Sequence, residues 1–149
     1  MKRALILSGG WTGHDPEGFA ALTVAALESL GFAHEVSRSL DVLTDAAHLK
    51  ETDLVVPIWT MGKLTEPQEK GILAAVEAGT GLAGFHGGMC DAFRENASWQ
   101  FMTGGQFVSH PGGIIDFAVH VEKPEDPVMK GIRDFSLRSE QYYMHVDPA

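Results

Sequence analysis

The sequence predicts an α/β protein with a mainly parallel β-sheet. Two short apolar runs, at residues 4–7 and 54–59, have the pattern of strands covered on both faces, since a strand with one face in water alternates apolar and polar residues. Segments with helical spacing separate the apolar runs, and an order of strand, helix and strand implies right-handed crossovers and parallel pairing. In such sheets ligands bind beyond the carboxyl ends of the strands, where the strand order switches.

The first half of the chain gives the clearest elements. A strand at residues 4–7 stops at a Gly-Gly pair, and a helix follows over 19–30. Asp15 is the expected N-cap of this helix, with Pro16 in its first turn and Gly31 just beyond its end. A weaker strand is expected at 33–37, a short helix at 45–51 and a third buried strand at 54–59.

The second half is less regular. Thr65 and Gln68 have the spacing of a capping box, which predicts a helix that ends at Gly79. We then expect a strand at 81–86, a helix at 98–102 and a strand at 114–121, while 135–146 has no clear pattern.

Composition limits the class of protein. The 149 residues include 11 Lys and Arg against 20 Asp and Glu, a formal net charge of −9, and 44% of them are hydrophobic. We therefore expect one globular domain over 1–149 that binds neither nucleic acid nor anionic membranes, because both need clustered cations. The single cysteine, and the lack of a signal peptide or of an apolar run near the roughly 20 residues of a spanning helix, predict a cytoplasmic protein.

The strongest chemical signal is the sequence Gly-Phe-His-Gly-Gly at 84–88. It has the form of a strand-to-helix elbow, in which small residues flank a strained position so that one side chain projects above the sheet. The projecting residue is His86, and the backbone N–H groups of Gly87 and Gly88 would surround a ligand there. An imidazole serves as a general base, a nucleophile or a metal ligand near neutral pH, and a hydrogen-bonded structural histidine is the alternative.

Other candidates follow the first and third strands. His14 and Asp15 lie in a loop after the first strand, and Trp59 ends the third strand. A tryptophan here, Trp59 or Trp11, could stack on a sugar ring, although core packing is the alternative for both. Cys90 offers a second elbow around a thiol, but the apolar pattern ends too early for it, and a small buried residue on the next helix is expected.

Further histidines and one carboxylate come later. A glycine-rich loop at 104–113 carries His110, and Glu140 and His145 stand near the end of the chain. A carboxylate that orients His86 would raise its basicity, which makes Glu140 the candidate partner. The sequence requires no cofactor; no zinc-binding spacing is present, so zinc or another divalent metal would need ligands from separate loops.

These motifs, in order along the chain, resemble the ThuA-like family, named for trehalose utilisation. The resemblance rests on Gly-Trp-Thr-Gly-His-Asp-Pro-Glu at 10–17, the turn at 84–88, Gly-Gly-Gln-Phe-Val-Ser-His-Pro-Gly-Gly at 104–113, Asp-Pro-Val-Met-Lys-Gly-Ile at 126–132 and Ser-Glu-Gln-Tyr-Tyr-Met-His at 139–145. It implies a flavodoxin-like three-layer sandwich similar to class I glutamine amidotransferases. In that family the elbow cysteine is absent, and His86 stands in its place, which implies that the protein is not a glutaminase. Family members usually continue further, so we expect a C-terminal segment to be lacking from this chain.

The resemblance implies carbohydrate metabolism without a mechanism. We expect a small sugar-like ligand, with catalysis by His86 and Glu140 in a hydrolase or isomerase, and binding by His14, Asp15, Trp59, Gly87, Gly88, His110 and His145. The alternative is a non-catalytic sugar-binding or partner-binding domain on the same scaffold. A cysteine hydrolase that uses Cys90, and a homo-oligomer, are further interpretations that the residues leave open.

Overall fold

The computed structural model describes residues 1–147. Contacts between its residues divide the chain into two compact units. Unit 1 consists of residues 1–106 with the described residues from Val146 on, and unit 2 is Phe107–His145. The expectation of one domain stays a prediction, and each unit is described by itself.

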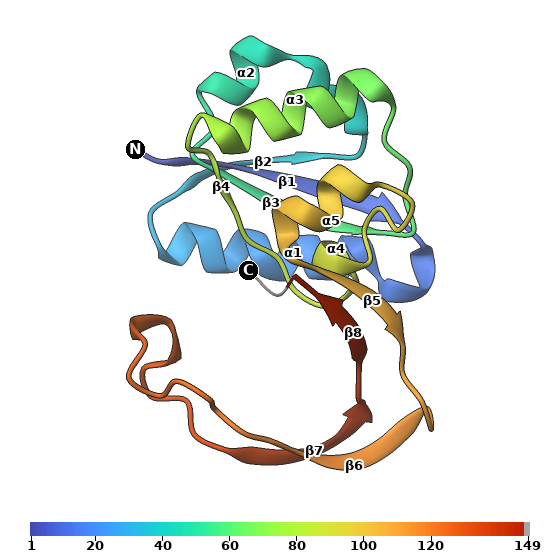
Figure 1. Ribbon diagram of the computed structural model, residues 1–149. Coiled ribbons are helices and arrows are strands. Elements are labelled where there is room, and N and C mark those ends of the chain that lie inside the picture. The colour runs from blue at the N-terminus through green and yellow to red at the C-terminus, as the bar shows by residue number, and fades with distance from the viewer. Residues whose placement is uncertain (148–149) are drawn as a thin grey trace. The chain divides into compact units, whose positions relative to one another are not determined.

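Unit 1 contains the parallel sheet that the sequence predicts. Its strands are β1 (Arg3–Gly10), β2 (Ala33–Ser37), β3 (Leu54–Thr60) and β4 (Gly81–Leu82), in the order β2-β1-β3-β4. All three pairings are parallel. Helix α1 (Pro16–Ser29) covers one face, and α2 (Ala46–Lys50) and α3 (Glu66–Glu77) cover the other (Figure 1). Since β2 and β3 lie on opposite sides of β1, the strand order switches between β1 and β3.

The sheet is buried on both faces because side chains alternate along its central strand. Ile6 contributes to a cluster with Leu27 of α1, whereas Leu5 and Leu7 join a larger cluster with Ile72 of α3. The larger cluster also holds Phe93 and Trp99, from the segment after the sheet and from α5 (Ala97–Thr103). A strand with apolar residues on both faces therefore needs the continuous apolar run seen in the sequence.

The predicted helix ends are also confirmed. The Asp15 carboxylate accepts a hydrogen bond from the Gly18 N–H at 3.2 Å, and Gly31 follows α1 with a φ of +76°. At α3, the Thr65 N–H donates to Gln68 Oε1 at 2.9 Å. Short 3₁₀ segments at Thr12–His14 and Leu40–Thr44 complete the loops after β1 and β2.

The fourth strand is shorter than predicted. A strand was expected over 81–86, but β4 ends at Leu82, and only the Ala83 N–H continues the pairing, to the Val55 oxygen at 3.1 Å. Two residues further along β3 stands Pro57, which has no N–H to donate on that side of the strand. The ladder therefore stops, and residues 83–86 leave the sheet towards α4 (Gly87–Cys90).

The segment 104–113, expected as a glycine-rich loop, contains strand β5 (Gly105–Ser109). The unassigned segment 135–146 contains β7 (Phe135–Glu140) and β8 (Tyr143–Val146), and β8 pairs with β5.

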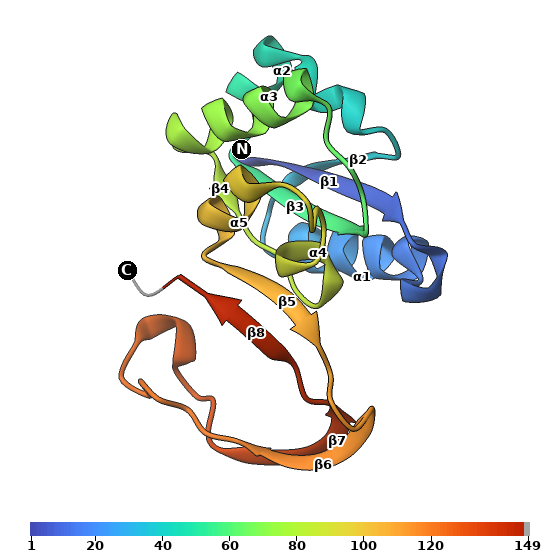
Figure 2. The same ribbon diagram turned by 45° about the vertical axis from the view of Figure 1, so that its right-hand side comes forward.

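Unit 2 is built around an antiparallel pair. Strand β6 (Ile114–Val119) pairs with β7 along its whole length, and a 3₁₀ turn, Pro127–Met129, lies in the long connection between them (Figure 2). One face of the pair is apolar, with Phe117 opposite Leu137, and the other carries Asp116 opposite Arg138. No residue of unit 2 is fully buried. Within residues 1–147, none of the helices has the length and apolar character needed to cross a membrane.

Candidate functional site

Strained backbone gathers where the strands of unit 1 end. Within the described chain, only three residues other than glycine have a positive φ: Asp15 at 44°, Met61 at 57° and His86 at 52°. They follow β1, β3 and β4 respectively, so all three lie beyond the carboxyl ends of parallel strands. Such conformations cost about 1–3 kcal/mol each and cluster at functional sites. This edge of the sheet is therefore the candidate site.

The strained turn predicted at His86 is present. His86 has φ 52° and ψ −133° and is the N-cap residue of α4. These angles lie outside the regions that a residue with a Cβ adopts without strain. Gly87 and Gly88 behind it are buried. The turn thus places a histidine at the position that an elbow gives to its projecting residue.

The glycines of this turn are required by close packing. A Cβ on Gly87 would lie 2.5 Å from Thr60 Oγ1 and 2.8 Å from His14 Nδ1, and a Cβ on Gly88 would meet the Pro57 carbonyl oxygen. A Cβ on Gly84 would lie 2.5 Å from the Met89 side chain. Glycine at 87 and 88 therefore lets the turn approach the ends of β1 and β3.

Two histidines meet at this turn. The ring centroids of His14 and His86 are 4.5 Å apart, with the ring planes inclined at 52°. His14 Nδ1 is 3.0 Å from the hydroxyl oxygen of Thr60. Because His14 follows β1 and Thr60 ends β3, this hydrogen bond spans the point where the strand order switches.

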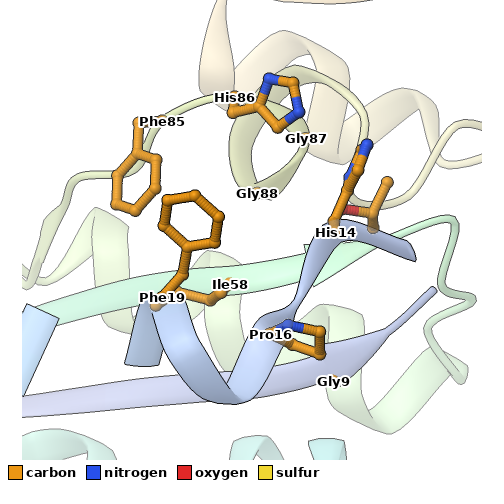
Figure 3. A pocket seen from close by; sticks show the side chains of 10 residues that line it. Gly9, His14, Pro16, Phe19, Ile58, Phe85, His86, Gly87 and Gly88 are labelled. Carbon is orange, nitrogen blue, oxygen red and sulfur yellow. The ribbon is translucent and has the colours of Figure 1, made fainter. Parts of the chain in front are cut away.

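A small pocket opens beside the two imidazoles. His14 and His86 line it together with Pro16, Phe19, Ile58 and Phe85, and the backbone of Gly9, Gly87 and Gly88 forms other parts of its wall (Figure 3). The rings of Phe19 and Phe85 lie side by side, 5.6 Å between centroids. The pocket volume is about 20 Å³, which is near the space one water molecule needs. A sugar ring does not fit inside it.

The two candidate tryptophans lie in different surroundings. Trp11 is 49% exposed and its ring packs edge-on against His14, with centroids 4.7 Å apart. Trp59 is half-buried and packs against the hydrophobic cluster on the α3 side of the sheet. Neither ring lines the pocket, but Trp11 is the one that contacts His14 of the histidine pair.

Cys90 lies at the end of α4, half-buried. Burial raises the pKa of the Cys90 thiol, and a hydrogen bond with Thr103 opposes the effect. A raised pKa keeps the thiol protonated near neutral pH, whereas a nucleophilic cysteine needs a lowered one. This disfavours the cysteine hydrolase.

The other predicted site residues belong to unit 2. His110 Nε2 and Glu140 Oε1 are 3.6 Å apart, and the ring of His145 lies 5.8 Å from that of Tyr143. The partnership of Glu140 with His86 stays a prediction. Within residues 1–147, no three side chains of His, Cys, Asp or Glu gather closely enough to suggest a metal site.

The sequence analysis missed six residues that line the pocket: Gly9, Pro16, Phe19, Ile58, Thr60 and Phe85. Thr60 contacts His14, and Phe19 and Phe85 line the pocket. Thr60 is the last residue of β3, so the rule that places sites at strand ends could have found it. The phenylalanines carry no such signal, because apolar residues on a helix and after a strand suggest core packing.

Comparisons with known proteins agree on one family. The ThuA family model, described as trehalose utilisation, matches residues 3–149. The chain is also similar to the crystal structure of a ThuA-like protein from Bacteroides uniformis, with a TM-score of 0.76 and 20% sequence identity. That match covers 99% of this chain and 62% of the other, so the chain spans less than two thirds of that protein's length. No curated protein matches the chain.

Proposed function

Because the chain belongs to the ThuA family, described as trehalose utilisation, we propose that it acts on or binds a small sugar-derived ligand at the carboxyl edge of its sheet. The observation that carries this proposal is the strained backbone of His86 beside His14. A fold retains strain of this kind where the geometry serves a site.

The ligand lies over the pocket rather than inside it. The pocket holds about 20 Å³, whereas Trp11 stands half-exposed beside His14. The apolar face of a sugar ring suits an aromatic surface, and its hydroxyl groups suit imidazole nitrogens and backbone N–H groups. Trp11 and Trp59 were the two candidates for stacking on a sugar ring, and we propose that Trp11 is the one that does so.

We propose that the scaffold is flavodoxin-like and related to class I glutamine amidotransferases. The strand order β2-β1-β3-β4 supports it, because flavodoxin-like sheets share this order and bind ligands at the switch between β1 and β3. His86 then replaces the elbow cysteine, and no glutaminase chemistry follows. The cytoplasmic location belongs to the same proposal.

His86 is the proposed general base or metal ligand. An imidazole exchanges a proton near neutral pH, and backbone N–H groups after the elbow stabilise developing negative charge. Glu140 is the proposed orienting carboxylate, and His110 and His145 the proposed binding residues of unit 2. We also propose that this site binds a divalent metal such as zinc. Elemental analysis of the purified protein tests whether the metal is present.

The test compares His86→Ala with His120→Ala. His120 is an exposed histidine of unit 2, so its replacement controls for loss of an imidazole as such. We expect His86→Ala to weaken trehalose binding, measured by calorimetry, by about tenfold, roughly 1.4 kcal/mol. His120→Ala should leave it unchanged, and both variants should unfold near the parent temperature. Equal affinity in the parent and in His86→Ala would refute the proposal.

The alternative is a non-catalytic sugar-binding or partner-binding domain. The proximity of His14 and His86 favours an enzyme. Incubation with trehalose or a keto derivative of it, followed by product analysis, separates the two. Saturable binding without product supports the alternative.

A further inference from the structure

Two phenylalanines stand at the mouth of the histidine pocket, and the proposed function does not yet use them. Phe19 belongs to α1, and Phe85 directly precedes His86 in the elbow. Both line the pocket (Figure 3), although 37% of Phe19 and 46% of Phe85 remain exposed. Large apolar side chains that are exposed as a group, rather than singly, mark binding surfaces.

The exposed apolar surface continues along α1. Phe19 and Leu22 are three residues apart, which makes them neighbours on the helix surface, and Leu22 is 66% exposed. Ala26 is exposed one turn further along the same side of the helix. We call Phe19, Leu22, Ala26 and Phe85 the apolar rim. None of the four side chains is charged, in a chain with a net charge of −9, so the rim suits an uncharged group.

The two rings of the rim form a wedge rather than a flat platform. Their centroids are 5.6 Å apart, and the ring planes are inclined at 55°. The C–H face of a sugar ring suits one flat aromatic surface, whereas two inclined rings suit a compact group of aliphatic or aromatic carbon. Phenylalanine, unlike tryptophan or tyrosine, also has no polar atom for a hydrogen bond with a hydroxyl group. The wedge therefore fits a part of a ligand that carries no hydroxyl groups.

The rim and the two histidines meet at one pocket. His14 and His86 line the same walls as Phe19 and Phe85. Because the pocket volume is only about 20 Å³, a ligand larger than water lies across its mouth. Since Phe85 and His86 are consecutive, a ligand in that position extends from the histidines onto the rim.

We propose that the ligand of this site is a glycoside with an apolar aglycone, the group that is attached to the sugar. The sugar lies at His14 and His86, and the aglycone packs against Phe19 and Phe85. The inference rests on the proposed function for the sugar, and it adds the chemical class of the attached group.

The experiment compares phenyl α-glucoside with methyl α-glucoside, which share one sugar and differ in the aglycone. Calorimetry on the full chain measures both dissociation constants. We expect the phenyl compound to bind about tenfold more tightly, because its larger apolar area leaves water at the rim. Equal affinities, or no binding of either compound, would overturn the inference.

Two variants on different elements assign this preference to the rim. Phe85→Ala and Phe19→Ala should each reduce it from about tenfold to about twofold, with little change in the affinity for methyl α-glucoside. Phe19→Ala leaves the sequence of the elbow intact, so it separates the loss of a ring from a disturbance of His86. As the matched control, Phe101→Ala removes a 77% exposed phenylalanine of α5 that does not line the pocket, and it should keep the full preference.

Other roles of the rim give other results. If the two rings only stabilise the fold, the alanine variants unfold at a lower temperature but keep the phenyl preference, which overturns the inference. If the rim binds a second copy of the chain, sedimentation shows an oligomer that Phe19→Ala dissociates, which also overturns it. Should an alanine variant fail to fold, Phe19→Leu and Phe85→Leu keep an apolar side chain without the ring, and they should still reduce the preference.

Failure of the proposed function is distinguishable from failure of this inference. If His86→Ala binds trehalose as the parent does, while Phe85→Ala removes the phenyl preference, the apolar rim stands and the role of His86 does not. If His86→Ala weakens trehalose binding, while the parent binds both glucosides equally, the proposed function stands and the aglycone does not.

Discussion

The two units of this molecule are stabilised in different ways. All the fully buried hydrophobic side chains among residues 1–147 belong to unit 1, where they fill both faces of the parallel sheet. Unit 2 has no fully buried residue. It is held by the hydrogen bonds of the β6–β7 ladder and by exposed pairs such as Arg138 with Asp116, 2.8 Å apart. A lone pair of strands is marginally stable in water, so unit 2 should open far more readily than unit 1.

This difference explains where strain is found. The three non-glycine residues with positive φ all belong to unit 1, beside a core that can offset their cost. No such residue occurs in unit 2. A strained backbone conformation persists only where the contacts around it hold it in place. Among the described residues, only unit 1 provides a packed core that can do so.

The largest expected effect is a core deletion. Leu7→Ala removes a fully buried side chain of β1 and should lower the free energy of unfolding by about 2–5 kcal/mol. Leu137→Ala, at a half-buried position of β7, should cost less than about 1 kcal/mol. Urea unfolding measures both. Similar losses at the two positions would show that unit 2 is packed as tightly as unit 1.

A smaller effect is expected at the elbow. Glycine adopts the backbone angles of His86 without a Cβ clash, so His86→Gly should relieve strain that His86→Ala retains. We expect the glycine variant to be more stable than the alanine variant by about 1 kcal/mol, after the entropic cost of glycine. Thermal unfolding of the two variants measures the difference. An alanine variant as stable as the glycine variant would mean that the turn stores no strain.

The smallest effect is a pH dependence in unit 2. The Val121 N–H, 2.8 Å from Asp134 Oδ1, and then the side chain of His120, lower the pKa of the Asp134 carboxyl. The carboxylate is favoured in the folded state, so its bonds are complete above the usual pKa of 3.8 and are lost as the pH falls through the lower folded value.

Asp134 precedes β7 and Val121 follows β6, so these bonds tie the two strands together at one end. The Val121 amide proton should therefore titrate with a midpoint below 3.8, followed by NMR, and Asp134→Asn should abolish the titration. Amide resonances of Leu5, Ile6 and Leu7, in the buried middle of β1, should not follow this titration. A midpoint at or above 3.8 would contradict the assigned contacts.

Unit 1 could be predicted from sequence because its signals are local. Apolar runs mark β1 and β3, and Asp15 and Gly31 mark the ends of α1. The end of β4 could not be predicted, because it depends on Pro57 in the neighbouring strand. Strands β5, β7 and β8 were missed since an exposed ladder leaves little apolar periodicity.

The site was predictable to a similar extent. Glycines flanking His86, and a histidine after β1, indicated the elbow and its neighbour, which the structure brings to 4.5 Å between ring centroids. The contact between His14 and Thr60 joins residues 46 apart in the sequence, and only the strand register decides such a pairing. Which tryptophan stands beside the histidines is also decided by tertiary contacts, because Trp11 packs on His14 while Trp59 packs on the hydrophobic cluster on the α3 side.

The register of the central strand also bears on how the chain folds. Strand β1 pairs with β2 at residues 33–37 and with β3 at residues 54–60, and its larger hydrophobic cluster is completed by Trp99. Contacts so distant in sequence slow the search for the native state. The most buried strand of the sheet therefore precedes all its partners in the chain, and it stays exposed to aggregation or chaperone binding until they are available.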